Sequence, residues 1–286
     1  MGPACGPATG PSRQNAAPER SDLEHIFQKT LPFAPWMTEA SRRLPGVQPL
    51  KMTDWLVVDD AFAGQMAARD RLLSERRAEV LAPGPSDAPA AELLALILAH
   101  LGPGYGRAAG QVTRPDGVTV RLDGPPLLTA ARLVQEDLCI LEKPDGAPEH
   151  VLTAAALCFP ASWTLAEKIG HPLSRIHAPV SVYDADMAPR VQRLFDRVHP
   201  ERPLWRQNAL LYADPTLYHP RTELQPRVAP AERPDYLRSE RQCILRLWDT
   251  GAVVFSIHTW VLPFASLTAA QLATLKTYPI EYEGRT

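Results

Sequence analysis

The sequence predicts an α+β fold in which helices flank an antiparallel sheet. Three features lead to this prediction. Apolar residues make up 45% of the 286 residues, which is enough for a substantial core. Two β-rich runs, 243–248 and 252–261, flank the turn sequence Asp249-Thr250-Gly251 and form the clearest hairpin signal. Helix-forming stretches such as residues 90–101 and 187–198 lie between other short strand-like runs.

The N-terminal part divides into a tail and the start of the folded unit. Residues 1–20 are rich in Pro, Gly and Ala and have little to bury, so we expect a disordered tail, followed by one domain over residues 21–286. The proline-fixed, aromatic sequence LPFAPW at 31–36 is expected to pack over the surface as a strap. A short strand at 55–58 and helices over 61–80 and 90–101 follow.

The middle of the chain predicts a hairpin. Residues 118–122 favour a strand, and residues 131–141 favour either a strand or a passage from helix to strand. The turn sequence at 144–146 leads into the apolar run 151–159, which Pro160 ends because proline cannot extend a sheet ladder. A short helix over residues 165–169, closed by Gly170 and Pro172, is expected next.

The C-terminal part predicts a helix, three strands and a last helix. Residues 187–198 have apolar side chains at helical spacing, and residues 205–212 favour a strand. A long proline-rich connection to Pro234 precedes the 243–261 hairpin. Thr268 has the residue type and position of the N-cap of a final helix.

Composition and motifs exclude several functional classes. The net charge is −2 with scattered basic residues, which argues against nucleic acid and against a polybasic membrane patch. No apolar run is long enough for a membrane helix, the first 20 residues lack the apolar core of a signal peptide, and the four cysteines are widely spaced, so a reducing cytoplasm is expected. The nucleotide-binding, zincin and serine-hydrolase motifs GxGxxG, GxxxxGK[ST], HExxH and GxSxG are absent from the sequence.

Three histidines and one acidic segment are candidates for a site. His177 lies in an apolar setting, where an imidazole is either a satisfied core residue or a metal ligand. His258 shares a strand face with Trp260, and this face lines a cofactor cavity or points to solvent. His100 closes a helix, where a charged histidine is favoured by the dipole. Glu136 lies among apolar neighbours, so it either pairs with an arginine or serves a site.

Three long blocks of sequence carry a family resemblance. These are LCFPASWTLAEKIGHPLSRIHAPV at 157–180, RPLWRQNALLYADPTLY at 202–218 and LRSERQCILRLWDTGAVVFSIHTWVLPF at 237–264. They resemble the haem-binding subunit of the haem-dependent oxidative N-demethylases, the dimethylamine monooxygenase family. The resemblance extends over residues 31–275 and implies a PAS-like sheet that holds b-type haem.

The resemblance also implies roles for individual residues. His177 becomes the expected axial ligand, since it lies in the matched block and its approach is restricted by Pro179, with His258 and then His100 as alternatives. Arg175 and Arg206 would bind the haem propionates or lie at the surface. Trp163 and Trp260 would pack on the porphyrin or simply in the core. Glu136 would supply a carboxylate for the substrate ammonium.

The implied reaction is oxidative N-demethylation of a dimethylamine-like secondary amine to a primary amine and formaldehyde, with O2 as oxidant. Electrons would come from a partner reductase with flavin and iron–sulfur centres, and a folate-binding subunit would take up the formaldehyde. Both partners would be separate chains, because four scattered cysteines do not have the spacing of an iron–sulfur site. Two alternatives remain: a PAS-like haem sensor without turnover, and a small-molecule binding protein without haem.

Overall fold

The computed structural model describes residues 24–43, 45–178, 187–226 and 233–281. The expected disordered tail at 1–20 lies outside these ranges. Their main element is a seven-stranded antiparallel sheet whose order is β1-β8-β9-β10-β6-β7-β2. The strands are β1 (Gln48–Pro49), β2 (Leu81–Ala82), β6 (Asp137–Glu142), β7 (Val151–Ala156), β8 (Leu204–Tyr212), β9 (Tyr236–Arg246) and β10 (Val253–Pro263). With its flanking helices, this sheet confirms the predicted α+β class.

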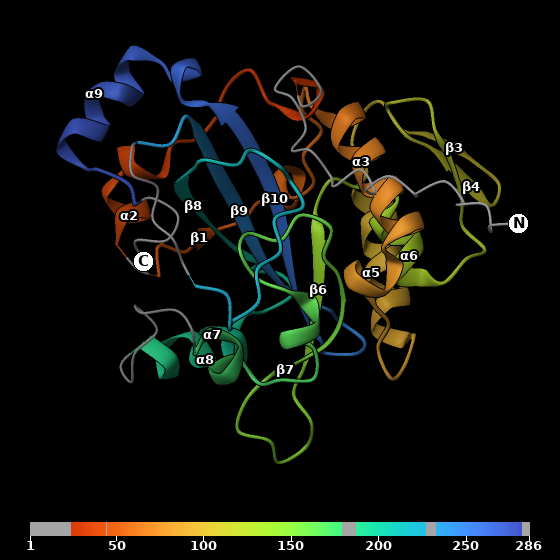
Figure 1. The fold of residues 1–286 in the computed structure, drawn as a ribbon. Helices are drawn as coiled ribbons and strands as arrows, with labels where there is room; N and C mark the ends of the chain where they lie inside the picture. Colours follow the sequence, from red (N-terminus) through yellow and green to blue (C-terminus); the bar gives the residue numbers. More distant parts are fainter. Residues whose placement is uncertain (1–23, 44, 179–186, 227–232, 282–286) are drawn as a thin grey trace, which may run out of the picture.

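Helices and a second, small sheet surround the main sheet (Figure 1). The small sheet has the order β3-β4-β5, with β3 (Gly106–Ala108), β4 (Gln111–Thr113) and β5 (Thr119–Arg121). The α-helices are α2 (Glu39–Arg42), α3 (Phe62–Glu75), α4 (Arg77–Val80), α5 (Ala88–His100), α6 (Pro126–Ala131), α7 (Leu173–His177), α8 (Met187–Arg197) and α9 (Ala269–Thr277). The 3₁₀ turns are η1 (Glu24–Ile26), η2 (Pro35–Met37), η3 (Met52–Asp54), η4 (Leu165–Glu167) and η5 (Phe264–Ser266).

The β9–β10 hairpin is the centre of the main sheet. Its register runs without interruption from Val253 opposite Arg246 to Pro263 opposite Tyr236. The predicted turn closes it, and Gly251 has the positive φ of 69° that the turn needs. The β6–β7 hairpin joins the other edge of β10, so the middle-chain prediction is also confirmed, and residues 131–141 form a passage from helix α6 to strand β6.

The two faces of the main sheet are covered by different helices. On one face, side chains of α3, α5 and α6 pack against residues such as Leu138, Leu245 and Val254. On the other face, Cys139, Leu141 and Ile244 pack with residues of α7, α8 and η4. Figure 1 shows α3, α5 and α6 grouped to the right of the sheet and α7 and α8 at its lower left. Because side chains alternate along a strand, neighbouring residues of β10 contribute to different environments.

The strap and the last helix pack together at the end of the hairpin. Leu31 and Trp36 are buried, and the Trp36 indole Nε1 donates to the Gln271 carbonyl at 3.1 Å. Thr268 is the N-cap of α9, where its hydroxyl accepts from the Gln271 backbone and the Gln271 side chain accepts from the Thr268 backbone. The prediction of this cap from sequence is therefore confirmed.

The segment before His177 differs from its prediction. The expected helix at 165–169 is the single 3₁₀ turn η4, and Pro172 is the N-cap of α7 instead of a terminator. Proline suits a helix start because its φ is already helical and its missing N–H would be unsatisfied there anyway. His177 is consequently the last residue of a helix that follows the expected one.

Two properties of the described ranges bear on the type of protein. Within them, no helix has the length and hydropathy needed to cross a membrane. Cys139, Cys158 and Cys243 are buried free thiols, and burial raises the pKa of Cys158 and Cys243 to about 12. Cys5 lies outside the described residues.

Candidate functional site

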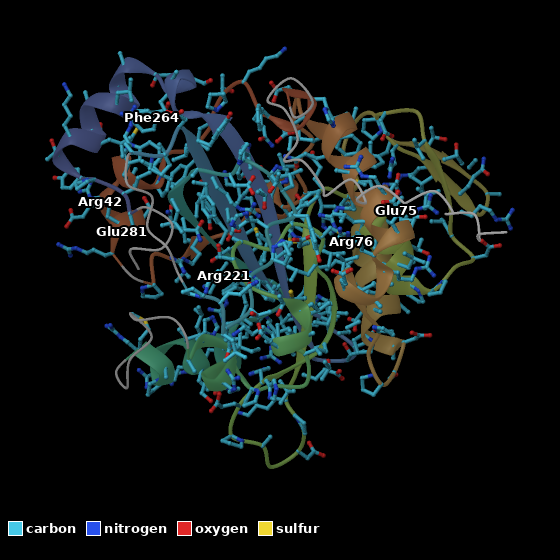
Figure 2. All side chains as sticks on the ribbon, in the orientation of Figure 1. Arg42, Glu75, Arg76, Arg221, Phe264 and Glu281 are labelled. Atoms are coloured by element: carbon cyan, nitrogen blue, oxygen red, sulfur yellow. The ribbon has the colours of Figure 1, made fainter. Side chains whose placement is uncertain are left out.

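A cavity of about 670 Å³ lies between the main sheet and the α7–α8 pair. Strands β6 to β10 supply its floor: Cys139, Leu141, Leu152, Arg206, Asn208, Glu240, Gln242, Ile244, Phe255 and Ile257. The helices supply much of its roof: Leu173, Ile176, His177, Val191, Leu194 and Phe195. The rest comes from Pro45 and Val47 and from the segments around Trp163 and Arg221. In Figure 2, Arg221 lies between the sheet and the α7–α8 pair, whereas Arg76 lies by α3 on the other side.

Polar and apolar side chains divide the floor of this cavity. Phe255 pairs with Ile244 and Cys139 across the ladders, so one part is apolar. Arg206 pairs with Gln242, and Asn208 pairs with Glu240, so the neighbouring part is polar. Residues directly opposite each other in an antiparallel pair point to the same face, which is why four polar side chains from two strands gather at one end.

His177 contributes an imidazole to the roof. Its Nδ1 donates to the Leu173 carbonyl at 2.9 Å, one helical turn back. This bond fixes the ring orientation and places the proton on Nδ1, so the nitrogen with a lone pair for a metal is Nε2. Burial lowers the pKa of His177, and the positive charges of Lys168 and Arg206 lower it further against the effect of the Leu173 bond. The ring is therefore a neutral imidazole at pH 7. Pro179 lies outside the described residues.

Trp163 and Arg206 also line the cavity. Trp163 is half-buried and follows Ser162, whose positive φ of 59° is unusual for a residue with a side chain. The Ser162 amide donates to the His219 carbonyl at 2.9 Å, which holds this bend in place. Arg206 has a buried Nε with no partner among the described residues, and burial lowers its pKa although the charge of Glu240 opposes this. Arg206 is thus a desolvated cation whose hydrogen-bonding capacity is incompletely used.

Arg175 lies in α7 but is not one of the residues that line the cavity. Its two terminal nitrogens each donate to Glu223 at 2.9 Å, and its side chain is 44% exposed. Glu223 also accepts from Lys168 at 2.7 Å, and Lys168 reaches the Ile176 carbonyl at 2.8 Å. The Arg175 and Lys168 hydrogen bonds lower the pKa of Glu223 to about 2. We call this group the Glu223 clasp, because it ties the 221–226 segment of the cavity wall to the helix that carries His177.

His258 and Glu136 lie together on the opposite face of the sheet. His258 Nδ1 is 3.1 Å from the Glu136 carboxylate, and Nε2 is 3.1 Å from the Asp59 carboxylate. Despite burial, the hydrogen bonds that His258 donates to Asp59 and Glu136 raise the pKa of His258 to about 9. Both ring nitrogens therefore donate in an imidazolium ion at neutral pH, which leaves neither as a lone-pair donor.

Trp260 and His100 are also away from the cavity. The Trp260 ring centroid is 4.4 Å from that of His258, which confirms that the two share a strand face. His100 Nδ1 donates to the Leu96 carbonyl at 2.9 Å within α5. The structure therefore brings together His177, Trp163 and Arg206 of the expected site residues, and it places Arg175, Glu136, His258 and Trp260 outside the cavity wall.

Several cavity residues were not singled out from the sequence. Glu240, Gln242 and Asn208 line the floor, and Lys168 lines the wall. The sequence did contain a signal for them, because Glu240 and Gln242 share one face of an otherwise well-buried strand with Ile244. Polar side chains at every second residue of a strand, beside a buried apolar residue, indicate that this face of the strand contacts polar groups.

One comparison with known proteins bears on this site. The family model described as "Haem-dependent oxidative N-demethylase, alpha subunit-like" matches residues 46–277. The match includes all five cavity strands and the helices α7 and α8. The family's name implies haem dependence and an enzyme with more than one type of subunit. The chain belongs to the haem-dependent oxidative N-demethylase alpha subunit-like family.

Proposed function

We propose that this chain binds haem b in the 670 Å³ cavity through His177 and uses it to demethylate a small secondary amine such as dimethylamine. The observation that carries the proposal is the imidazole of His177 at the cavity wall, neutral and oriented by its bond to the Leu173 carbonyl. Histidine is the axial donor in several classes of haem protein that handle O2. We also propose that the sheet and its helices form a PAS-like domain.

The residues that line the cavity fit a haem. A porphyrin needs an apolar slot, and Ile244, Phe255 and Leu194 with their neighbours supply one. Its propionates need cations, and Arg206 has a buried Nε without a partner among the described residues. Trp163 would pack on the porphyrin face or edge. The volume lies within the range of small-molecule sites.

Bound haem would supply the iron at which O2 is reduced and activated. The protein's own residues would orient and protect this chemistry. His177 would hold the cofactor, the apolar wall would exclude water, and the polar end of the floor would bind the amine. The overall change is that one amine methyl group, O2, two electrons and two protons give the demethylated amine, formaldehyde and water.

Electrons would reach this site from a separate reductase subunit with flavin and iron–sulfur centres, and a folate-binding subunit would take up the formaldehyde. The family's name as an alpha subunit supports partners in general. The described cysteines support a separate reductase, because Cys139 and Cys243 lie on different strands and Cys158 follows a third, without the grouping of a cluster site.

The test combines an absorbance spectrum of the haem-loaded protein with a deuterium-labelled substrate. The purified protein is loaded with hemin, its Soret band is recorded, and it is supplied with O2, NADPH and a surrogate ferredoxin–reductase pair. Dimethylamine with deuterated methyl groups should give deuterated formaldehyde, identified by mass spectrometry, in amounts exceeding the haem present. A Soret band without formaldehyde would indicate a haem sensor, and a protein that takes up no hemin would contradict the proposal.

A further inference from the structure

The polar end of the cavity floor contains a carboxylate that has no short contact with a cation among the described residues. Glu240 lies in the middle of β9, is 8% exposed and lines the cavity. Its neighbours across the ladders are Asn208 in β8 and Thr259 in β10. A buried carboxylate normally has short bonds to cations or N–H groups, because desolvation without them is costly.

The contacts of Glu240 are all long. Oε2 accepts from Gln242 Nε2 at 3.2 Å and from Asn208 Nδ2 at 3.4 Å, and Oε1 lies 3.5 Å from Arg238 Nε. By contrast, the half-buried Glu223 accepts at 2.7–2.9 Å. The Arg238 guanidinium also donates to the Leu217 and Phe159 carbonyls, so it is shared among several acceptors. Since a carboxylate offers about four acceptor sites, Glu240 retains capacity for a further donor.

Thr259 provides a second indication at the same position. It stands directly opposite Glu240 in the β9–β10 ladder and is 1% exposed, yet its Oγ1 has no partner among the described residues. A carboxylate with spare acceptor capacity and a buried hydroxyl without a partner therefore lie side by side on the cavity face of the sheet. Such a pair matches a ligand with two N–H donors.

Arg206 is a cation of the cavity wall, but it does not neutralise this carboxylate. The charge of Glu240 acts on Arg206, but no ion pair joins them within the part of the chain that the structure describes. Their charges are opposite and both belong to the cavity wall, so each suits a different charged group of bound ligands. Arg206 suits a carboxylate such as a propionate, and Glu240 suits an ammonium ion.

We propose that Glu240 binds the ammonium group of the protonated substrate amine, with the Thr259 hydroxyl as the acceptor of its second N–H. This inference rests on the proposed function, and it assigns substrate recognition to β9 instead of to Glu136 on the opposite face. A secondary ammonium ion has two N–H donors, a tertiary one has one, and a quaternary one has none. The arrangement therefore favours secondary amines, with tetramethylammonium as the weakest ligand of the series.

The experiment is a calorimetric titration of the haem-loaded protein with dimethylammonium chloride at pH 7.5. Glu240→Gln keeps the shape and removes the charge, and it should raise the Kd at least about tenfold, as expected for a lost charge-assisted hydrogen bond. Glu136→Gln is the matched control, because it makes the same change to a buried carboxylate outside the cavity, and its Kd should stay within twofold of wild type. The Soret absorbance per protein reports haem occupancy in every variant.

The outcomes separate this inference from the proposed function. Haem-loaded Glu240→Gln with wild-type affinity for dimethylammonium overturns the role of Glu240 alone, whereas a wild-type protein without a Soret band contradicts haem binding. Dimethyl ether, a neutral molecule of the same shape, provides a test that needs no variant. Wild type should bind dimethylammonium at least tenfold more tightly than the ether, and equal affinities overturn the inference even where Glu240→Gln fails to fold.

Discussion

The two faces of the central sheet hold the same side chain in opposite chemical states. On the cavity face, His177 Nδ1 donates to a neutral acceptor, the Leu173 carbonyl, and burial lowers the pKa of His177. On the other face, His258 lies between two carboxylates, and its pKa is raised to about 9. Burial by itself lowers the pKa of both rings, so the difference comes from the two carboxylates beside His258. An imidazole that stays neutral can ligate a metal, whereas one held between two carboxylates is a structural cation.

The first way to test this comparison is to make the same substitution on both faces. His258→Leu would leave the Glu136 and Asp59 carboxylates buried without their cation, which we expect to lower the free energy of unfolding by about 3–5 kcal/mol. His177→Leu removes the neutral hydrogen bond to the Leu173 carbonyl, which should cost about 1 kcal/mol. Urea denaturation of the haem-free proteins measures both, and equal losses would contradict the contrast.

The pH dependence of stability should separate the two faces as well. Because the pKa of His258 is raised from 6.5 to about 9 on folding, its contribution is complete below pH 6.5 and is lost as the pH rises through 9. The free energy of unfolding should then fall by up to about 1.4 kcal/mol per pH unit within this window. His258→Leu should remove that slope. An unchanged slope in the variant would assign it to other groups.

The lowered pKa of His177 affects the stability of the protein below pH 6.5, whereas the raised pKa of His258 affects it above this pH. Because the His177 imidazole is neutral in the folded protein, its contribution to stability is complete above pH 6.5. This contribution is lost as the pH falls through the pKa that His177 has in the folded protein. Protons then compete with the metal for Nε2, so hemin affinity should fall in the same acidic range.

Two arginines on opposite faces of the sheet allow the effect of removing one positive charge to be compared between the faces. Arg206 lines the cavity, whereas Arg241 stacks on the Trp205 ring at 4.8 Å on the other face, and each has a buried Nε without a partner among the described residues. Arg206→Gln should weaken hemin binding about tenfold through loss of a charge-assisted hydrogen bond. Arg241→Gln should leave it unchanged. Hemin transfer to apomyoglobin gives both values, and similar effects of the two substitutions would argue against a propionate at Arg206.

The smallest expected effect concerns the Glu223 clasp. Arg175→Gln removes one exposed cation from this group and leaves Lys168 in place. Exposed ion pairs contribute little, so hemin release should accelerate roughly two- to fivefold with no change in the Soret maximum. A shifted maximum would show that Arg175 acts on the haem environment directly, as expected from the sequence alone.

Local signals predicted much of the fold. The turn Asp249-Thr250-Gly251 and the Thr268 cap depend on residues near in sequence, and both were predicted correctly. Pro172 was misread because proline disfavours a helix interior yet is favoured at a helix start. Local sequence does not say which of these positions a proline occupies when the helix that follows is only one turn long.

The candidate site was less predictable, because its members come from distant strands. Alternation showed correctly that His258 and Trp260 share a face, but it did not show which face has the cavity. Glu136 meets His258 only because β6 and β10 are adjacent in this register, and their sequence separation of 122 residues carries no local signal. His177, Trp163 and Arg206, by contrast, do line one cavity.

The most direct test is a hemin titration of wild type and His177→Gly, each with and without added imidazole, followed by absorbance and resonance Raman spectroscopy. We predict one haem per wild-type chain with an iron–imidazole band in the ferrous form, loss of that band in His177→Gly, and its return with exogenous imidazole. A His177→Gly protein that binds hemin with wild-type affinity and keeps the band without imidazole would contradict ligation of the haem iron by His177.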